Sequence, residues 1–272
     1  MKHKLAQKYR YSLILLKELV ITEFKLRYQG SVLGYLWSLL RPLFLFIILY
    51  FVFVYFLKIG NGIPHWPVAL LLGIVLWNFF SEATNNGLTS IVNRGDVIRK
   101  INFPKYVILL AGCASAFINL LLNLVVIGVF MAINQVSLSW MALLTPFYIA
   151  EMFVFALGLS FILSTVYVRL RDMNYIWEII MQALFYASAI IYPVAMVVEK
   201  SPEIAKLMLL NPIAQTVQDA RFTLISDQNP TLLSMTNGNI MIAMIPIVIV
   251  IASLVFGAWL FKKRSPHFAE DV

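Results

Sequence analysis

The stretch KLRYQGSVLGYLWSLLRP, residues 25–42, leads into the first long apolar run of the chain and decides how that run begins. Gly30 and Gly34 lack a Cβ atom, so the chain can turn sharply there. Pro42 suits the first turn of a helix, because the N–H that it lacks has no partner at that position. The stretch is therefore suited to an elbow at the edge of a membrane.

The residues before this elbow, about 11–29, mix leucines and isoleucines with charged side chains. The segment is too charged to span a bilayer and too apolar for a free tail, which favours an amphipathic helix lying in the cytoplasmic interface. An ordinary basic anchor beside the membrane explains the residues equally well. In either case the candidates for interfacial access are Lys25, Arg27, Tyr28 and Arg41.

The composition is that of an integral membrane protein. Of the 272 residues, 61% are hydrophobic and 12% are charged, whereas a soluble domain is about half apolar and about a quarter charged. The net charge of +8 comes from short basic clusters between apolar runs. This distribution indicates membrane topology and contact with anionic lipids rather than nucleic-acid binding. The single cysteine, Cys113, excludes an intrachain disulfide.

Six apolar runs are long enough to cross the hydrocarbon core, which takes about 20 residues. Because lipid cannot pair with backbone groups, each run is expected to be helical, and the alternating pattern of a transmembrane barrel is not seen. The expected fold is all-α, with one transmembrane domain over residues 1–272. The expected spans are Leu36–Leu57, Val68–Leu88, Val107–Ile133, Trp140–Val166, Tyr175–Val197 and Ile240–Phe261.

Lysine and arginine are concentrated at the N-terminus, between the second and third runs, between the fourth and fifth, and in the C-terminal tail. The positive-inside rule then places both termini in the cytoplasm. The one long outer connection is about Val198 to Asn239, and Asn211-Pro212 interrupts its helical apolar pattern. We expect two short, re-entrant-like helices there; a surface loop with one helical turn is the alternative.

Enzyme and ATPase motifs are absent from the sequence. No G-x-x-x-x-G-K-[ST] loop is available to hold nucleotide phosphates, no His or Cys cluster suggests a metal, and no G-x-S-x-G nucleophile motif occurs. We therefore expect a chain with no catalytic residue, metal or bound cofactor. Any active transport must draw its energy from a partner subunit or an ion gradient.

Polar and aromatic residues within the spans are candidates for a transport path. Glu82 is followed one turn later by Asn85 and Asn86, and an ionised residue inside the bilayer, which costs about 3 kcal/mol, avoids lipid. This polar stripe either lines a conduit or bonds neighbouring helices. Aromatic faces pack on sugar rings, although Trp and Tyr are also common at membrane interfaces. The conduit candidates are Tyr50, Trp77, Asn78, Glu82, Asn85, Asn86, Tyr186 and Tyr192.

Four segments resemble the permease subunits of ABC type-2 polysaccharide exporters, which handle O-antigen, teichoic acid and capsule-like polymers. They are FKLRYQGSVLGYLWSLLRP, RGDVIRKINFPKYVI, VRLRDMNYIWEIIMQALFYASAIIYP and LNPIAQTVQDAR. Together with the length and the number of spans, the likeness covers nearly the whole chain. The resemblance implies a homodimeric permease in the bacterial cytoplasmic membrane. It also implies two copies of a nucleotide-binding ATPase subunit that uses ATP and Mg²⁺, and a lipid-linked polysaccharide as substrate.

The resemblance also assigns roles to two segments. The loop at 93–105 holds the position of the helix that couples to the ATPase, through Arg94, Asp96, Arg99, Lys100, Phe103 and Lys105; its position alone favours a loop that only fixes topology. The outer segment at 198–239 holds the position of helices that gate the exit, with Asn211, Pro212, Gln215, Asp219 and Arg221 as candidates.

Two other functions are open from the residues alone. The chain is compatible with a proton-coupled secondary carrier that uses Glu82 as a relay, although such folds commonly contain internal repeats and no clear repeat relates the first three runs to the last three. A non-transporting membrane scaffold for glycan assembly is the other possibility. A scaffold would leave the polar stripe without a purpose.

Overall fold

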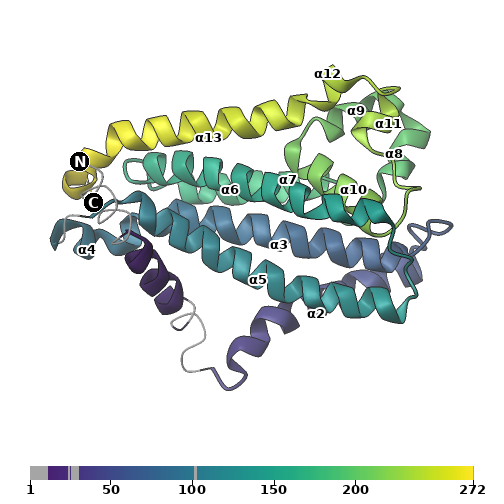
Figure 1. Cartoon of the computed structure of the whole chain (residues 1–272), viewed down its shortest axis with the longest axis horizontal. Coiled ribbons are helices and arrows are strands. Elements are labelled where there is room, and N and C mark those ends of the chain that lie inside the picture. The colour runs from purple at the N-terminus through teal and green to yellow at the C-terminus, as the bar shows by residue number, and fades with distance from the viewer. Residues whose placement is uncertain (1–11, 24, 26–30, 101–102, 272) are drawn as a thin grey trace.

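The computed structural model describes residues 12–23, 25, 31–100 and 103–271. This part of the chain consists of helices and their connections, and no β-strand occurs among these residues. Long helices run side by side along the molecule, while short helices gather at its two ends (Figure 1). The expected all-α membrane fold is confirmed.

Five helical segments in the described residues are long and apolar enough to cross a membrane. They correspond to the first four expected runs and the last one. They are α2 with its π-helical extension η2 (Trp37–Leu49, Tyr50–Phe56), α3 (Trp66–Ser90), α5 (Tyr106–Ile133), η4 with α6 (Trp140–Leu144, Thr145–Tyr167) and α12 with α13 (Ile240–Ala243, Ile245–Arg264).

The expectation of a single helix over Tyr175–Val197 is wrong. Helix α7 (Met173–Ala187) has 15 residues, or about 22 Å at 1.5 Å per residue, less than the thickness of about 30 Å of the hydrocarbon core. Ala189 then adopts a positive φ of 51°. Pro193, which lacks an N–H, precedes α8 (Val194–Lys200). The apolar run is continuous in sequence, but its backbone is broken.

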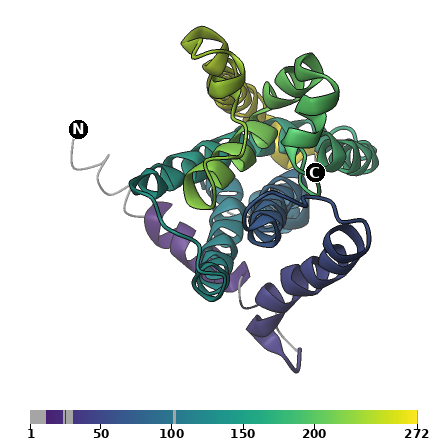
Figure 2. The same cartoon turned by 90° about the vertical axis from the view of Figure 1, so that its right-hand side faces the viewer.

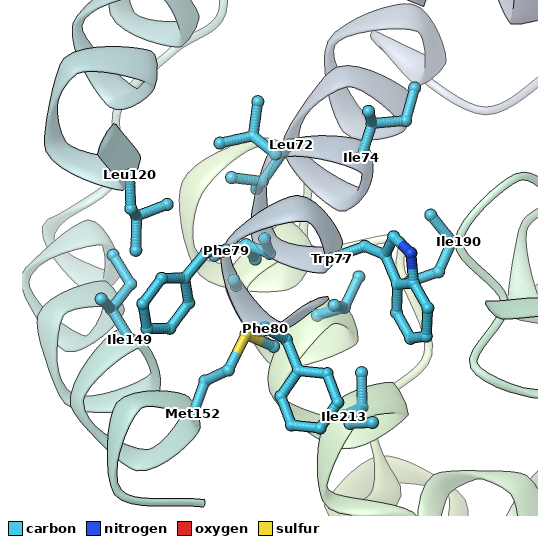
Figure 3. Packing of buried hydrophobic residues seen from close by; sticks show 14 of the residues in the cluster. Leu72, Ile74, Trp77, Phe79, Phe80, Leu120, Ile149, Met152, Ile190 and Ile213 are labelled. Carbon is cyan, nitrogen blue, oxygen red and sulfur yellow. The ribbon is translucent and has the colours of Figure 1, made fainter. Parts of the chain in front are cut away.

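Helix α3 lies in the middle of the molecule (Figure 2), and most of its residues are buried. Its large side chains leave in several directions: Trp77 points toward Ile190, and Phe79 points away from it toward Leu120 and α6 (Figure 3). Buried apolar side chains on several sides of a helix require neighbours on each of those sides. Helix α3 is thus the core around which the other elements pack.

Small residues let the long helices approach one another closely. A Cβ atom on Gly257 of α13 would collide with the carbonyl oxygen of Gly158 on α6, and one on Gly158 would lie 2.7 Å from the backbone nitrogen of Leu254. A Cβ atom on Gly87 of α3 would collide with Ser160 of α6. Such small-residue crossings are typical of helices packed in lipid.

Short helices close the two ends of the bundle. At one end lie α8, α9 (Pro202–Leu209), α10 (Pro212–Leu224) and α11 (Leu232–Met235). At the other end lie α4 (Gly95–Lys100) and the C-terminal η5 and α14 (Ser265–His267, Phe268–Asp271), as Figure 1 shows. Short helices are therefore present between Val198 and Asn239, but they are α9, α10 and α11 rather than the two expected, and their re-entrant character stays a prediction.

Candidate functional site

A polar cavity of about 460 Å³ lies between α2, α3 and α5. Half of the eight conduit candidates line it, all from α3: Asn78, Glu82, Asn85 and Asn86. The facing walls include Trp37, Ser38 and Arg41 of α2 and Asn119 and Asn123 of α5. These residues recur three or four positions apart, which places each set on one face of its helix.

Hydrogen bonds cross between the helices that form this cavity. Asn119 donates from Nδ2 to Oε1 of Glu82 at 2.8 Å. Asn123 donates to the carbonyl oxygen of Ser38 on α2 at 3.2 Å, and Asn86 donates to that of Gly112 on α5 at 3.3 Å. The polar stripe of α3 therefore lines a cavity and also bonds neighbouring helices, while its place in a conduit stays a prediction.

The other conduit candidates lie outside this cavity. Trp77 faces Phe185 of α7, with ring centroids 5.4 Å apart. Tyr192 donates from its hydroxyl to the carbonyl oxygen of Tyr186 at 2.6 Å. Tyr50 of η2 packs beside Phe46 at 5.9 Å. Within one copy of the chain the structure therefore does not bring all eight residues together into one path.

Arg221, a gate candidate of the outer segment, is fully buried and holds three backbone carbonyls in a clamp. Its guanidinium donates to the carbonyl oxygens of Ala69 at 2.9 Å, Ala189 at 2.9 Å and Ile190 at 2.7 Å. It also lies 5.0 Å from the ring of Trp66. Burial lowers the pKa of Arg221 to about 9. The clamp joins α10 to the start of α3 and to the break after α7.

A buried acid pair lies between α6 and α10. Glu151 is 7% exposed, and neither of its carboxylate oxygens has a hydrogen-bond partner among the described residues. Gln215 donates to Oδ2 of Asp219 at 2.6 Å, while its own Oε1 is also buried without a partner in the described chain. Burial raises the pKa of Asp219 to about 6, against the lowering effect of the Gln215 bond.

The two remaining gate candidates organise the start of α10. Asn211 accepts the N–H of Ile213 with its side-chain oxygen at 3.1 Å and donates to Oγ of Ser188 at 2.9 Å. Pro212 occupies the first position of the helix, where its missing N–H costs nothing. This end of α10 is therefore tied to the region where α7 ends.

The expected coupling residues lie at the opposite end, around α4. Arg94 pairs with Glu23 of the helix at residues 12–23, with 2.7 Å between Nη2 and Oε1. Lys105 donates to the carbonyl oxygen of Ser265 and lies 5.7 Å from the ring of Phe268, and burial lowers its pKa. The N-terminal helix, the loop and the C-terminal tail are thus tied together.

The other coupling candidates divide into exposed and packed residues. Asp96 and Arg99 form an exposed ion pair at 3.4 Å, and Lys100 is also exposed. Phe103 packs against the buried cluster that contains Ile98. Of the access candidates, Lys25 is exposed and Arg41 lines the cavity, whereas Arg27 and Tyr28 lie outside the described residues.

Comparison with known proteins identifies the architecture. The family model described as "ABC-2 type transporter" matches residues 14–225. The chain belongs to this family. The permease is 26% identical over 261 residues to the O-antigen export system permease protein RfbA of Myxococcus xanthus, with 95% of each chain covered. It is 31% identical over 216 residues to the protein of the same name from Klebsiella pneumoniae, covering 77% of this chain and 81% of that one. The resemblance found in the sequence is confirmed.

Several residues that organise this ABC-2 permease were missed in the sequence. Trp66 and Gly73 surround Arg221, and a Cβ atom on Gly73 would collide with the guanidinium. No local pattern links Trp66 or Gly73 to Arg221, because each lies about 150 positions before it in the sequence. Ser38 had a usable signal, because it precedes Arg41 by three positions and therefore shares its helix face.

Proposed function

We propose that the chain is the membrane-spanning subunit of an ATP-driven exporter that moves a lipid-linked polysaccharide across the cytoplasmic membrane. The observation that carries this proposal is the alignment over 95% of both chains with an O-antigen export permease. An alignment of that extent includes the elbow, the loop around α4 and the outer helices. Function is thus inferred from the full set of elements rather than from one motif.

The geometry of α4 supports its role as the contact with an ATPase subunit. Ile98 is buried against the bundle, while Val97 is 43% exposed and the Asp96–Arg99 ion pair also faces outward. The short helix is therefore anchored on one face and free on the other. Arg94 and Lys105 brace both flanks of this helix, so a push on α4 would reach the N-terminal helix and the tail.

A homodimer would cover the aromatic residues that are exposed on η2 and α7, among them the conduit candidate Tyr186. Phe51 and Tyr55 of η2 and Tyr186 of α7 are 52%, 65% and 60% exposed. We propose that a second copy covers these aromatic faces and that the polymer passes between the two copies. Aromatic faces and hydroxyls pointing into that passage suit sugar rings better than an ion.

Co-purification with the ATPase tests the proposal. The complex is isolated from native membranes in mild detergent, and ATP hydrolysis is measured for the wild type and for Asp96→Ala/Arg99→Ala. Glu203→Ala/Lys206→Ala is the matched control, because these residues form a similar ion pair, at 2.9 Å and with the same spacing, at the opposite end. We expect the α4 variant alone to lose the ATPase subunit or its coupling.

One outcome of the co-purification would refute the exporter proposal. If the wild type purifies without an ATP-hydrolysing subunit, and no candidate ATPase is stimulated by it, the exporter proposal fails. The carrier is then the second candidate, because Glu82 lies in a polar cavity with an amide partner. Glu82→Gln separates the two, since a proton carrier loses coupling and an ATP-driven exporter keeps most of its transport.

A further inference from the structure

The polar cavity contains more chemistry than the bonding of three helices requires. Its volume of about 460 Å³ lies within the range of about 300–1,000 Å³ that is typical of small-ligand sites. Its lining combines a guanidinium, a carboxylate, five carboxamides and an indole. Hydrogen bonds between the helices use only some of these groups. The remaining groups indicate the chemistry of a molecule that could bind there.

Asn119 presents an acceptor that lacks a donor. Its side chain is 6% exposed, and Nδ2 is already used by Glu82 at 2.8 Å. Its Oδ1 is buried, and no donor in the described part of the chain reaches it. A buried carbonyl left in this way is unfavourable. A hydroxyl group of a bound molecule would satisfy it.

Arg41 supplies the charge on the opposite wall. It is exposed at the cavity, and within the described ranges it forms no hydrogen bond or ion pair. A guanidinium offers a planar fork of donors that matches a phosphate. Trp37 lies one turn earlier on the same helix and is 44% exposed, so its indole face is available beside the phosphate for a sugar or glycerol group.

The surroundings of the cavity suit a molecule with a lipid tail. Phe44 and Ile48 of α2 are 52% and 59% exposed, and Leu122 and Val125 of α5 are 39% and 67% exposed. The two helices that flank the cavity thus present apolar outer faces. A hydrocarbon chain can remain in the bilayer along these faces while a polar head occupies the cavity.

We propose that this cavity binds the hydroxyl-bearing phosphodiester head of a membrane lipid. The phosphate lies on Arg41, hydroxyl groups bond to Oδ1 of Asn119 and to the Asn78 amide, and the head packs on Trp37. A lipid-linked sugar and phosphatidylglycerol share this chemistry. The choice of the lipid-linked sugar rests on the proposed function, whereas the headgroup site itself does not. With a sugar bound, the cavity is a loading site in each copy, separate from the aromatic faces of η2 and α7.

A binding experiment on the purified full chain in amine-oxide detergent tests the site. The probes are citronellyl phosphoryl-glucose, didecanoyl phosphatidylglycerol, and citronellyl phosphate, which carries no hydroxylated group. The variants are Arg41→Gln, Asn119→Leu and Asn78→Leu. The last removes a cavity amide that makes no hydrogen bond within the described residues, so no internal hydrogen bond is lost. Arg171→Gln and Asn134→Leu, which lie away from the cavity, are the matched controls.

We expect Arg41→Gln to weaken binding of all three probes about tenfold, as expected for the loss of a hydrogen bond to a charged group. Asn119→Leu and Asn78→Leu should weaken only the two hydroxyl-bearing probes, and the controls should bind as the wild type does. Tighter binding of the glucose probe identifies a lipid-linked sugar as the ligand, and tighter binding of the glycerol probe identifies phosphatidylglycerol.

The site is overturned if Arg41→Gln binds every probe as the wild type does, or if citronellyl phosphate binds as tightly as both hydroxyl-bearing probes. Failure of this site leaves the exporter proposal intact, because co-purification of an ATPase does not depend on Arg41. Conversely, absence of an ATPase leaves the binding results unchanged. The two proposals can therefore fail separately.

Discussion

At the scale of single residues, Arg221 is a fully buried cation that needs hydrogen-bond acceptors from distant parts of the chain. Its three bonds go to backbone carbonyls, two of which belong to the break between α7 and α8, where helical hydrogen bonding is interrupted. Gly73 provides the space for the guanidinium. The sequence could place Arg221 in an outer segment, but it could not show this burial, because the acceptors are backbone atoms from distant parts of the chain.

Replacing Arg221 with alanine should leave these three buried carbonyl oxygens without a hydrogen-bond donor. We expect Arg221→Ala to lower the free energy of unfolding by at least about 3 kcal/mol, since each buried carbonyl without a donor costs about 1–3 kcal/mol. Arg221→Lys should be intermediate, and the exposed Arg171→Ala should change stability by less than about 0.5 kcal/mol. Thermal unfolding in detergent measures all three. Equal melting temperatures for Arg221→Ala and Arg171→Ala would contradict the clamp.

Glu151 is the opposite case, a buried group that its surroundings do not satisfy. Its oxygens and Oε1 of Gln215 are all acceptors without partners in the described chain. Glu151→Gln supplies an N–H donor of nearly the same shape, so we expect a gain of about 1 kcal/mol, or roughly 2–4 °C in Tm. Glu199→Gln, on the exposed end of α8, is the control. A lower Tm for Glu151→Gln would indicate that the carboxylate has a partner of its own.

Asp219 should make stability depend on pH. Burial raises its pKa to about 6 in the folded chain, against about 4 when unfolded. Its contribution to stability is therefore present below about pH 4 and is lost as the pH rises through about 6. We expect Tm to fall over this window by several degrees more in the wild type than in Asp219→Asn. Asp227→Asn, an exposed acid on the same segment, should behave as the wild type.

At the scale of elements, hydropathy predicted most of the long helices but not their continuity. The first four predicted runs and the last one match helices within a few residues, because length and apolar composition are enough to predict a membrane-spanning helix. The prediction of a single helix from Tyr175 to Val197 failed because the sequence stays apolar across the point where the backbone breaks. Its clues, Ala189 with a positive φ and Pro193, become informative only when the backbone is seen.

The crossing of α6 and α13 provides a test at this scale. Gly257→Val should push α13 away from Gly158 and lower stability by about 2 kcal/mol, as overpacking does. Gly128→Val on α5 is the matched control, because a Cβ atom at Gly128 meets no atom within 4 Å. Both variants place valine in a long helix, so the difference in their unfolding temperatures isolates the contact. A difference near zero would mean that the helices separate freely.

At the scale of the whole molecule, the chain ends are joined through α4. The helix at residues 12–23 reaches it through Glu23 and Arg94, and the C-terminal tail reaches it through Phe268 and Lys105. The sequence placed these segments on one side of the membrane by their charge, but charge alone could not show that they form one cluster. It also could not show which conduit candidates line the cavity and which lie elsewhere, because that division depends on the way α2 and α7 flank α3.

Removal of the C-terminal residues after Arg264 should therefore destabilise α4. For a chain that ends at Arg264, we expect amide hydrogen exchange at residues 95–100 to accelerate by about tenfold or more, because Lys105 and Ile98 lose packing partners. Exchange in α10, at the far end, is the internal control. Asp271→Ala, which removes the exposed pair with Arg169 at 3.3 Å, should have little effect. Unchanged exchange in the truncated chain would exclude the tail as a brace.

The Arg221 clamp also affects how such proteins can diverge. Because its acceptors are main-chain oxygens, Ala69, Ala189 and Ile190 can each be exchanged for other residues without loss of a bond. Apart from the arginine itself, only Gly73, which leaves room for the guanidinium, and Trp66, whose ring lies against it, are restricted by their side chains. A survey of related chains should then find no substitutions at the three carbonyl positions that correlate with the arginine, so methods that infer contacts from correlated substitutions would overlook these three hydrogen bonds.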